Sequence, residues 1–141
     1  MKIYFAGAIR GGRDETDNYK KIITYLSSKA EVLTEHVGSL KLTTIGETKP
    51  SDGEIFMRDM EWLQSADLVI AEVTTPSLGV GYELSIAEKL NIPILCLYRP
   101  IKGKRLSAMI NGNEKFKCQA YQTFDETKIH INNFLKQEQK A

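Results

Sequence analysis

A glutamate follows two glycines in the stretch PSLGVGYEL, which covers residues 76–84. The segment 80–91 is predicted to be a helix, and at about 100° per residue Glu83 falls inside its apolar arc. That arc consists of Val80, Leu84, Ala87 and Leu90. A carboxylate directed toward a core is tolerated only if its charge is compensated. The expected position in the first helical turn supplies free N–H groups and the positive end of the helix dipole, so we expect Glu83 to stay ionised, as a nucleophile must be.

A second carboxylate, Asp59, lies in a predicted helix that Ser51 or Asp52 can cap and that runs to about Gln64. Asp59 sits on the flank of an apolar arc formed by Phe56, Met60 and Leu63. No helix terminus stands beside it, so it should be desolvated and hold a proton more readily. Two acids in unlike environments would make a nucleophile and a general acid, as in glycoside cleavage. The alternative, that each acid is a local cap or salt-bridge partner, stays open.

The loop after the first predicted strand combines glycines with two arginines in the sequence GAIRGGR. Glycines, backbone amides and guanidinium groups together suit an anion such as phosphate. The segment is neither a P-loop nor a GxGxxG fingerprint. A glycine-rich turn with solvated arginines is the alternative reading. The candidate residues are Gly7, Ala8, Ile9, Arg10, Gly11, Gly12 and Arg13.

Three further polar residues stand at expected element ends. His36 follows the second strand and is a candidate ligand contact or an ordinary loop histidine. Ser77 and Ser107 are each candidates to donate to a phosphate or to cap a turn.

Strands and helices are expected to alternate along the chain. Strands are predicted at 2–6, 31–34, 68–73, 93–98 and near 120–124, and helices at 16–28, 54–64, 80–91 and 125–137, with a mobile loop over 37–53. This order predicts one α/β domain over 1–141, with a tail that frays from about residue 137. We expect a three-layer sandwich of Rossmann or flavodoxin type with a five-stranded, mainly parallel sheet. Ligands of such sheets bind beyond the carboxyl ends of the strands.

Composition narrows the class of protein. The formal net charge is +1, from 19 basic and 18 acidic residues, which is unlike the basic surface of a dedicated nucleic-acid binder. No apolar run approaches the ~20 residues that span a bilayer. Cys96 and Cys118 form no metal or disulfide pattern. A soluble, cytoplasmic protein with reduced thiols is therefore expected, without a membrane or nucleic-acid polymer as partner.

Five blocks of the sequence together resemble a known family. They are YFAGAIRGGR, VLTEHV, DMEWLQSADLVIAEVTTPSLGVGYEL, ILCLYRP and LSAMI, and they span about residues 2–110. In these blocks the chain resembles the 2'-deoxynucleoside 5'-monophosphate N-glycosidases of the nucleoside 2-deoxyribosyltransferase superfamily. The resemblance implies hydrolysis of the bond between base and deoxyribose.

The resemblance also implies roles for individual residues. Glu83 matches the nucleophile that forms a covalent glycosyl-enzyme, Asp59 the acid that assists departure of the base, and Tyr4 a tyrosine whose hydroxyl positions the nucleophile. The IRGGR loop, Ser77 and Gly79 match the 5'-phosphate site. His36 is counted among the substrate contacts.

The resemblance further implies a homodimer and chemistry without metal or organic cofactor. Ser107 matches a serine that reaches the phosphate site of the neighbouring subunit, and Met109 belongs to the same segment. Ala8 departs from the family, whose members often have a hydroxyl residue there, so weaker phosphate affinity is expected.

Three alternatives to this hydrolase remain. A nucleoside 2-deoxyribosyltransferase would pass the sugar to a second base, and a glycosidase of CMP type would accept ribonucleotides. A non-catalytic nucleotide sensor would keep the anion site without needing either acid. The loop 37–53 is expected to shape the base pocket.

Overall fold

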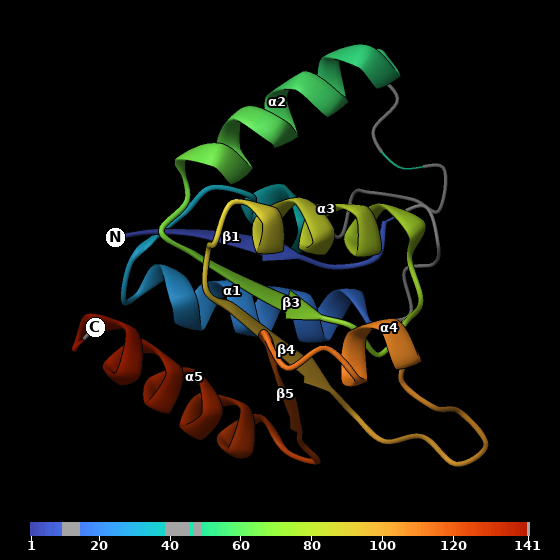
Figure 1. Cartoon of the computed structure of the whole chain (residues 1–141), viewed down its shortest axis with the longest axis vertical. Helices are drawn as coiled ribbons and strands as arrows, with labels where there is room; N and C mark the ends of the chain where they lie inside the picture. The colour runs from blue at the N-terminus through green and yellow to red at the C-terminus, as the bar shows by residue number, and fades with distance from the viewer. Residues whose placement is uncertain (10–14, 39–45, 47–48, 141) are drawn as a thin grey trace.

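The computed structural model describes residues 1–9, 15–38, 46 and 49–140. Within these residues five parallel strands form one sheet in the order β2-β1-β3-β4-β5 (Figure 1). The strands are β1 Lys2–Ala6, β2 Glu31–Val32, β3 Leu68–Glu72, β4 Ile94–Tyr98 and β5 Phe116–Ala120. The single α/β domain with a five-stranded sheet is as the sequence predicted, and every pairing is parallel.

Helices cover both faces of the sheet. The helices α1 Thr16–Ser27 and α5 Phe124–Gln139 lie on one face, while α2 Asp52–Ser65 and α3 Leu78–Lys89 lie on the other (Figure 1). A short helix, α4 Ala108–Asn111, contacts β5, and the 3-10 helix η1 Glu35–Gly38 follows β2. Each pair of long helices closes one buried apolar cluster against the sheet, which gives the three layers.

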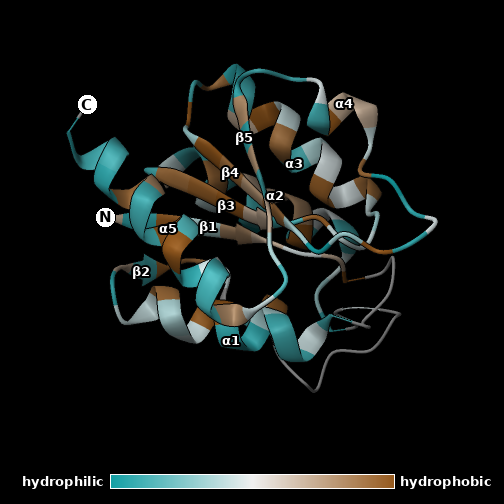
Figure 2. Cartoon of the chain, turned by 90° about the horizontal axis from the view of Figure 1, so that it is seen from below, coloured by the Kyte–Doolittle hydropathy of each residue, from teal (hydrophilic) through white to brown (hydrophobic). Residues whose placement is uncertain are grey.

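The hydrophobic strands explain why the sheet is central. All five residues of β3 are buried, as expected for a parallel strand that is covered on both faces. In Figure 2 the strands are mainly brown between helices whose outer faces are teal. None of the described helices is both long and apolar enough to cross a membrane.

Helix starts follow cap chemistry. Ser51 caps α2, and a complete capping box joins it to Glu54, so the predicted start was correct. The helix α3 begins at Leu78, two residues earlier than predicted, because the Ser77 hydroxyl accepts a hydrogen bond from the Val80 N–H at 3.3 Å. Both glycines of the turn expected before this helix therefore belong to its first turn and a half.

Two strands differ from the prediction. β2 ends at Val32 because the Thr34 hydroxyl takes over the contact with β1, accepting from the Phe5 N–H at 2.9 Å and donating to the Phe5 carbonyl at 2.6 Å. β5 covers 116–120 rather than 120–124, since Thr123 caps α5 by accepting from the Glu126 N–H.

The chain end was also predicted to fray earlier than it does. α5 continues to Gln139, where the Lys117 ammonium group bonds Gln137 and lies 3.6 Å from the Glu138 carboxylate. The predicted mobile loop 37–53 overlaps η1 and α2 at its two ends, and most of its middle falls outside the described residues.

The strand order places a ligand site between β1 and β3. The chain leaves β1 toward β2 on one side and returns to β3 on the other, so the connections diverge at this point. In open parallel sheets such a switch point opens a crevice at the carboxyl ends of the strands. The loops after β1 and β3, which carry most of the predicted site residues, meet there.

Candidate functional site

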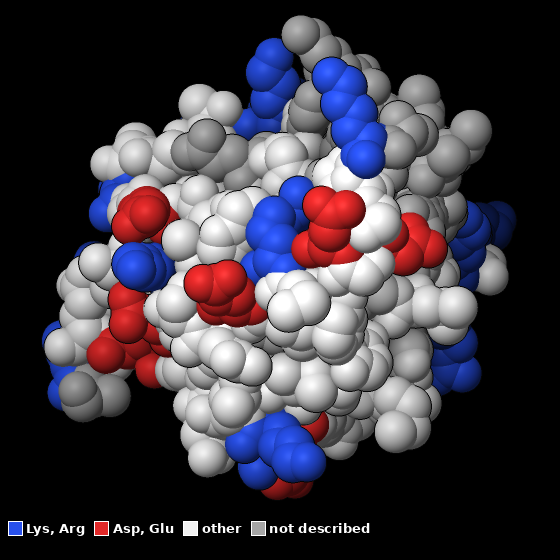
Figure 3. All heavy atoms as spheres, turned by 90° about the horizontal axis from the view of Figure 1, so that it is seen from above, with Lys and Arg blue, Asp and Glu red and all other residues white. Residues whose placement is uncertain are grey.

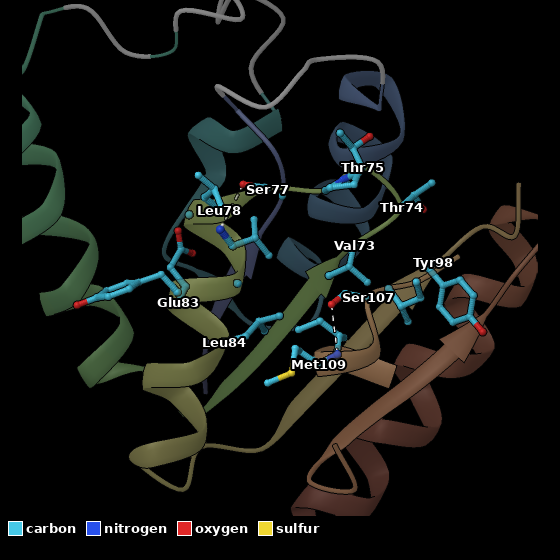
Figure 4. A pocket seen from close by; sticks show the side chains of 18 of the residues that line it. Val73, Thr74, Thr75, Ser77, Leu78, Glu83, Leu84, Tyr98, Ser107 and Met109 are labelled. Carbon is cyan, nitrogen blue, oxygen red and sulfur yellow. Dashed lines mark hydrogen bonds between the residues drawn. The ribbon is translucent and has the colours of Figure 1, made fainter. Parts of the chain in front are cut away.

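A groove of about 1700 Å³ lies at this end of the sheet. It is bordered by α2, α3 and the segment 98–111. Eight of the predicted site residues line it, and Figure 4 shows several of them pointing into it. These eight are Gly7, Ile9, Asp59, Ser77, Gly79, Glu83, Ser107 and Met109.

Glu83 is directed toward the N-terminal end of its helix, beside Ser77 (Figure 4). A helical side chain leans toward the preceding turn, so the Glu83 carboxylate lies over Gly79. A Cβ atom built at Gly79 would stand 4.0 Å from Glu83 Oε1 and 3.8 Å from Ser77 Oγ. The glycine thus leaves open space between the carboxylate and the hydroxyl, where a ligand can approach both.

The protonation of Glu83 differs from the expectation that the helix terminus keeps it ionised. Burial raises its pKa to about 7, the nearby Asp59 carboxylate acts in the same direction, and a hydrogen bond from the Tyr4 hydroxyl opposes the shift. Because α3 begins at Leu78, Glu83 is in the second turn, beyond the free N–H groups. At neutral pH the two protonation states are therefore of similar population.

Tyr4 lies in the middle of β1 and is almost fully buried beneath this carboxylate. Burial raises the pKa of its hydroxyl, and the charges of Glu83 and Asp59 raise it further. The hydroxyl consequently stays protonated and acts as a donor. By donating to the Glu83 carboxylate, the protonated Tyr4 hydroxyl holds one carboxylate oxygen in place.

Asp59 lines the groove on the α2 side and forms a salt bridge, which was the alternative considered for it. The Arg58 guanidinium donates to Asp59 Oδ1 from Nε at 2.9 Å and from a terminal nitrogen at 2.8 Å. The same guanidinium stacks over the Trp62 ring at 4.7 Å and lies 3.3 Å from His36 Nε2. The role of Asp59 as a general acid stays a prediction.

His36 is placed in this cluster rather than in the lining of the groove. Its ring lies 5.8 Å from the Trp62 ring, centroid to centroid. The ring nitrogen close to Arg58 faces a donor that is always charged. In this structure His36 contacts the base of α2, so its role as a direct substrate contact stays a prediction.

The first loop is only partly described. Gly7 and Ile9 line the groove, whereas Arg10, Gly11, Gly12 and Arg13 lie outside the described residues. Ala8 is fully buried, and its N–H donates to the Tyr19 hydroxyl at 3.1 Å, so that amide is already engaged. Packing explains Gly7, since a Cβ atom there would lie 3.0 Å from the Tyr19 ring.

Both candidate serines act as helix caps, which was the alternative considered for them. Ser77 caps α3, and the Ser107 hydroxyl accepts from the Met109 N–H at 3.2 Å at the start of α4 (Figure 4). A hydroxyl that accepts one such bond can still donate its own proton. Capping and phosphate contact are therefore compatible for each serine.

Sequence reasoning missed several residues of the groove. The polar residues follow or end β3 and β4; they are Thr74, Thr75, Tyr98, Arg99 and Lys104. The apolar and aromatic residues lie at the groove's outer rim; they are Phe56, Leu78, Tyr82 and Ile101. Thr74 and Thr75 had a signal, because they directly follow the most apolar strand. The rim residues had none, since single exposed apolar residues are common on protein surfaces.

Comparisons with known proteins agree with this fold. The chain is 53% identical to the 5-hydroxymethyl-dUMP N-hydrolase of Tetraodon nigroviridis over 113 residues, which is 79% of this chain and 80% of that one. It is 54% identical to the 5-hydroxymethyl-dUMP N-hydrolase of Esox lucius over 114 residues, 79% of each chain. The solved structure of a CMP N-glycosidase from Clostridium botulinum has the same fold, with a TM-score of 0.67 at 18% identity, over 94% of this chain and 98% of that one.

A family profile extends the likeness over nearly the whole chain. The profile described as nucleoside 2-deoxyribosyltransferase matches residues 3–132, which include β1, the groove and most of α5. The chain therefore belongs to the nucleoside 2-deoxyribosyltransferase family.

Proposed function

We propose that this protein hydrolyses the N-glycosidic bond of 2'-deoxynucleoside 5'-monophosphates and releases a free base and 2-deoxyribose 5-phosphate. The observation that carries the proposal is the pairing of Glu83 with Tyr4 and Asp59 at the groove. The names of the relatives at 53% and 54% identity support a nucleotide N-hydrolase. By those names, 5-hydroxymethyl-dUMP is the first substrate to assay.

The proposed reaction is a double displacement. The Glu83 carboxylate attacks C1' of the sugar, the C1'–N bond breaks, and its electron pair leaves with the base. Asp59 takes part in this step in its protonated form, passes that proton to the departing base, and is left as a carboxylate paired with Arg58. Water then attacks C1' of the glycosyl ester, gives up a proton to Asp59, and frees Glu83 as a carboxylate.

The environment of Glu83 suits this role. A pKa of about 7 leaves an appreciable ionised fraction at neutral pH, while partial burial keeps the carboxylate poorly hydrated and reactive. Tyr4 fixes the carboxylate by donating to it. Glu83 lies one helical turn after Gly79, so a sugar over the carboxylate would carry its 5'-phosphate toward Ser77 and the first loop.

We further propose that the protein works as a homodimer. A groove of about 1700 Å³ is larger than the ~300–1,000 Å³ of typical small-molecule sites, so a mononucleotide would fill only part of it. Large apolar side chains stand exposed around the groove and on α2: Leu78 is 97% exposed, Met109 81% and Met57 72%. Figure 3 shows a broad area without charged side chains on the face that carries α2.

A partner subunit would cover these apolar residues and narrow the groove. Ser107 of each subunit would then contribute to the phosphate site of the other, as the family resemblance implies. The exposed hydroxyl-bearing N-cap of α4 is consistent with such a contact.

Transfer to a second base is the competing activity, and the family's description supports it. The test is release of free base from 5-hydroxymethyl-dUMP and dUMP by the wild type and by Glu83→Gln, with Glu61→Gln as a matched control at an exposed glutamate of α2 that does not line the groove. Hydrolysis predicts base release without an acceptor, full loss in Glu83→Gln, and near wild-type rates in Glu61→Gln. Release that requires an added acceptor base would favour the transferase, and substantial turnover by Glu83→Gln would refute the assigned nucleophile.

A further inference from the structure

A second buried glutamate lies at the end of β3, on the opposite face of the sheet from Glu83. Glu72 is fully buried within the hydrophobic strand, and its carboxylate contacts Asn18 of α1 and Tyr121 after β5. It is not among the residues that line the groove. The proposed reaction leaves it without a role, although burying a carboxylate is costly.

The Glu72 carboxylate is surrounded by donors. Oε1 accepts from the Thr74 N–H at 2.6 Å, while Oε2 accepts from Thr74 Oγ1 at 3.0 Å and from Asn18 Nδ2 at 3.2 Å. The Tyr121 hydroxyl donates to Oε2 as well. Burial raises the pKa of Glu72, and the bonds from Tyr121 and Thr74 act in the opposite direction. Four donors and no acceptor describe a site built for a carboxylate.

The network continues to the first loop. Thr74 Oγ1 also accepts from the Arg99 N–H at 2.9 Å, and the Arg99 guanidinium forms an ion pair with Glu15. Asn18 Nδ2 lies 3.3 Å from Glu15 Oε2 as well as near Glu72. Glu15 is the residue directly before α1, so it marks the end of the glycine-rich loop. The network therefore ties the ends of two separate loops together.

These two loops are the two sides of the proposed anion site. The β3–α3 loop carries Thr75 and Ser77 into the groove, and Figure 4 shows Thr74 and Thr75 between β3 and Ser77. The first loop carries Gly7 and Ile9 into the groove from the side of β1. A phosphate bonded from both loops requires a fixed separation between them, because hydrogen bonds weaken steeply when their distances and angles are lost.

We propose that Glu72 is a positioning residue, which fixes the β3–α3 loop relative to Glu15 at the end of the first loop, so that the residues of both loops that line the groove reach the phosphate of the substrate. The proposal rests on the proposed function, because it assigns the phosphate to these loops. Glu83 itself depends little on Glu72, since α3 is anchored by the buried side chains of Val80, Leu84 and Ala87. Loss of Glu72 should therefore weaken substrate binding more than the chemical step.

Glu72→Gln is a suitable perturbation because it keeps the shape and removes two acceptor positions. If the amide nitrogen of the new glutamine side chain points toward Thr74, its N–H faces the backbone N–H of Thr74, which cannot turn away. With the nitrogen toward Asn18, the Asn18 amide must flip and then turns its oxygen toward Glu15. Either way one link between the loops is lost.

The test compares Glu72→Gln with Thr127→Ala, a control for a buried polar side chain in α5 whose hydroxyl donates to the Thr123 carbonyl and takes no part in the Glu72 network. Glu72→Gln should raise the KM for dUMP about tenfold, which corresponds to the free energy of one hydrogen bond. It should change kcat by less than about twofold. Tyr121→Phe, which removes one donor, should raise KM in the same direction by less. Thr127→Ala should lower the melting temperature and leave KM unchanged.

Binding of 2-deoxyribose 5-phosphate, measured by calorimetry, separates this proposal from the proposed function. If the wild type binds the sugar phosphate but cleaves no nucleotide, the hydrolase proposal fails, and Glu72→Gln should still weaken binding about tenfold. A lower melting temperature with unchanged KM and unchanged sugar phosphate affinity would overturn the role of Glu72. An equal loss of affinity for deoxyuridine, which lacks the phosphate, would overturn it too, as would a wild type that binds neither compound.

Discussion

The hydrogen bond from Tyr4 to Glu83 should set the pH at which the enzyme becomes active. If ionised Glu83 is the nucleophile, kcat/KM of the wild type rises with pH through about 7, the pKa of Glu83. Among the described residues, Tyr4 makes the interaction that lowers this pKa, and Tyr4→Phe removes it while keeping the burial and the Asp59 charge that raise the pKa. The rise in kcat/KM should therefore move to higher pH.

The size of the shift follows from the strength of the bond. A hydrogen bond to a charged group contributes about 1.5–3 kcal/mol, and one pKa unit corresponds to about 1.4 kcal/mol, so the expected shift is roughly 1–2 units. Part of this will be returned if water replaces the hydroxyl. The Tyr4 hydroxyl itself does not titrate in this range, because burial and two carboxylates raise its pKa.

The assay is base release from dUMP between pH 5 and pH 9, with kcat/KM determined at each pH for the wild type, Tyr4→Phe and Tyr25→Phe. The substrate phosphate also titrates near pH 6, but it does so equally for all three proteins, so the difference between profiles isolates the enzyme. Tyr25→Phe removes a hydroxyl that donates to Asn132 and does not line the groove, so it should keep the wild-type profile. An unshifted profile for Tyr4→Phe, or a shift to lower pH, would refute the reasoning.

Three other predictions rest on the same site. Asp59→Asn removes a charge that raises the pKa of Glu83, so the rise in kcat/KM should move to lower pH. The same variant should lower kcat by roughly 100-fold or more, because it removes the proton donor. A pH profile that does not move would contradict the interaction between Asp59 and Glu83. The folded-state pKa of Glu83 is about 7, against an ordinary value of 4.5, so the wild type should lose up to about 3 kcal/mol of stability as the pH rises from 4.5 through 7. Urea unfolding should therefore find Glu83→Gln more stable than the wild type at pH 8 and equally stable at pH 4. Equal stability of the two proteins at pH 8 would show that Glu83 is not buried as described. Mixing Glu83→Gln with Ser107→Ala subunits should restore activity that neither variant has alone. In the mixed dimer, one of the two sites combines an intact Glu83 from one subunit with an intact Ser107 from the other. Activity that stays at the level of the separate variants would exclude a shared site.

Periodicity and cap chemistry were enough to predict the layers of the fold. The apolar strands, the Ser51 capping box and the alternation of elements led to the correct fold class, and a groove lies at the end of the sheet where a ligand was expected. The errors arose where a side chain replaced a backbone contact. Thr34 ends β2 by bonding Phe5, and Ser77 starts α3 two residues early, and neither bond leaves a trace in hydrophobic periodicity.

The electrostatics of the site were harder to predict for a related reason. Adjacent residues on a helix do not normally face each other, so the Arg58–Asp59 pair had no signal in the spacing. The long arginine side chain reaches back because Trp62 and His36 hold it there. The pKa of Glu83 is higher than the position expected in the first helical turn suggested, because burial raises it and the helix begins two residues earlier.

Glu72 and Glu83 show how structure separates a structural acid from a candidate nucleophile. Both stand among apolar residues, but helical periodicity singles out Glu83 alone. Glu72 is satisfied by donors from Thr74, Asn18 and Tyr121 and does not line the groove. Among the described residues, Glu83 accepts from the Tyr4 hydroxyl and lies beside the open space over Gly79. A carboxylate that the protein leaves half satisfied beside a groove is free to react with a ligand, whereas one that is fully satisfied can only hold its neighbours in place.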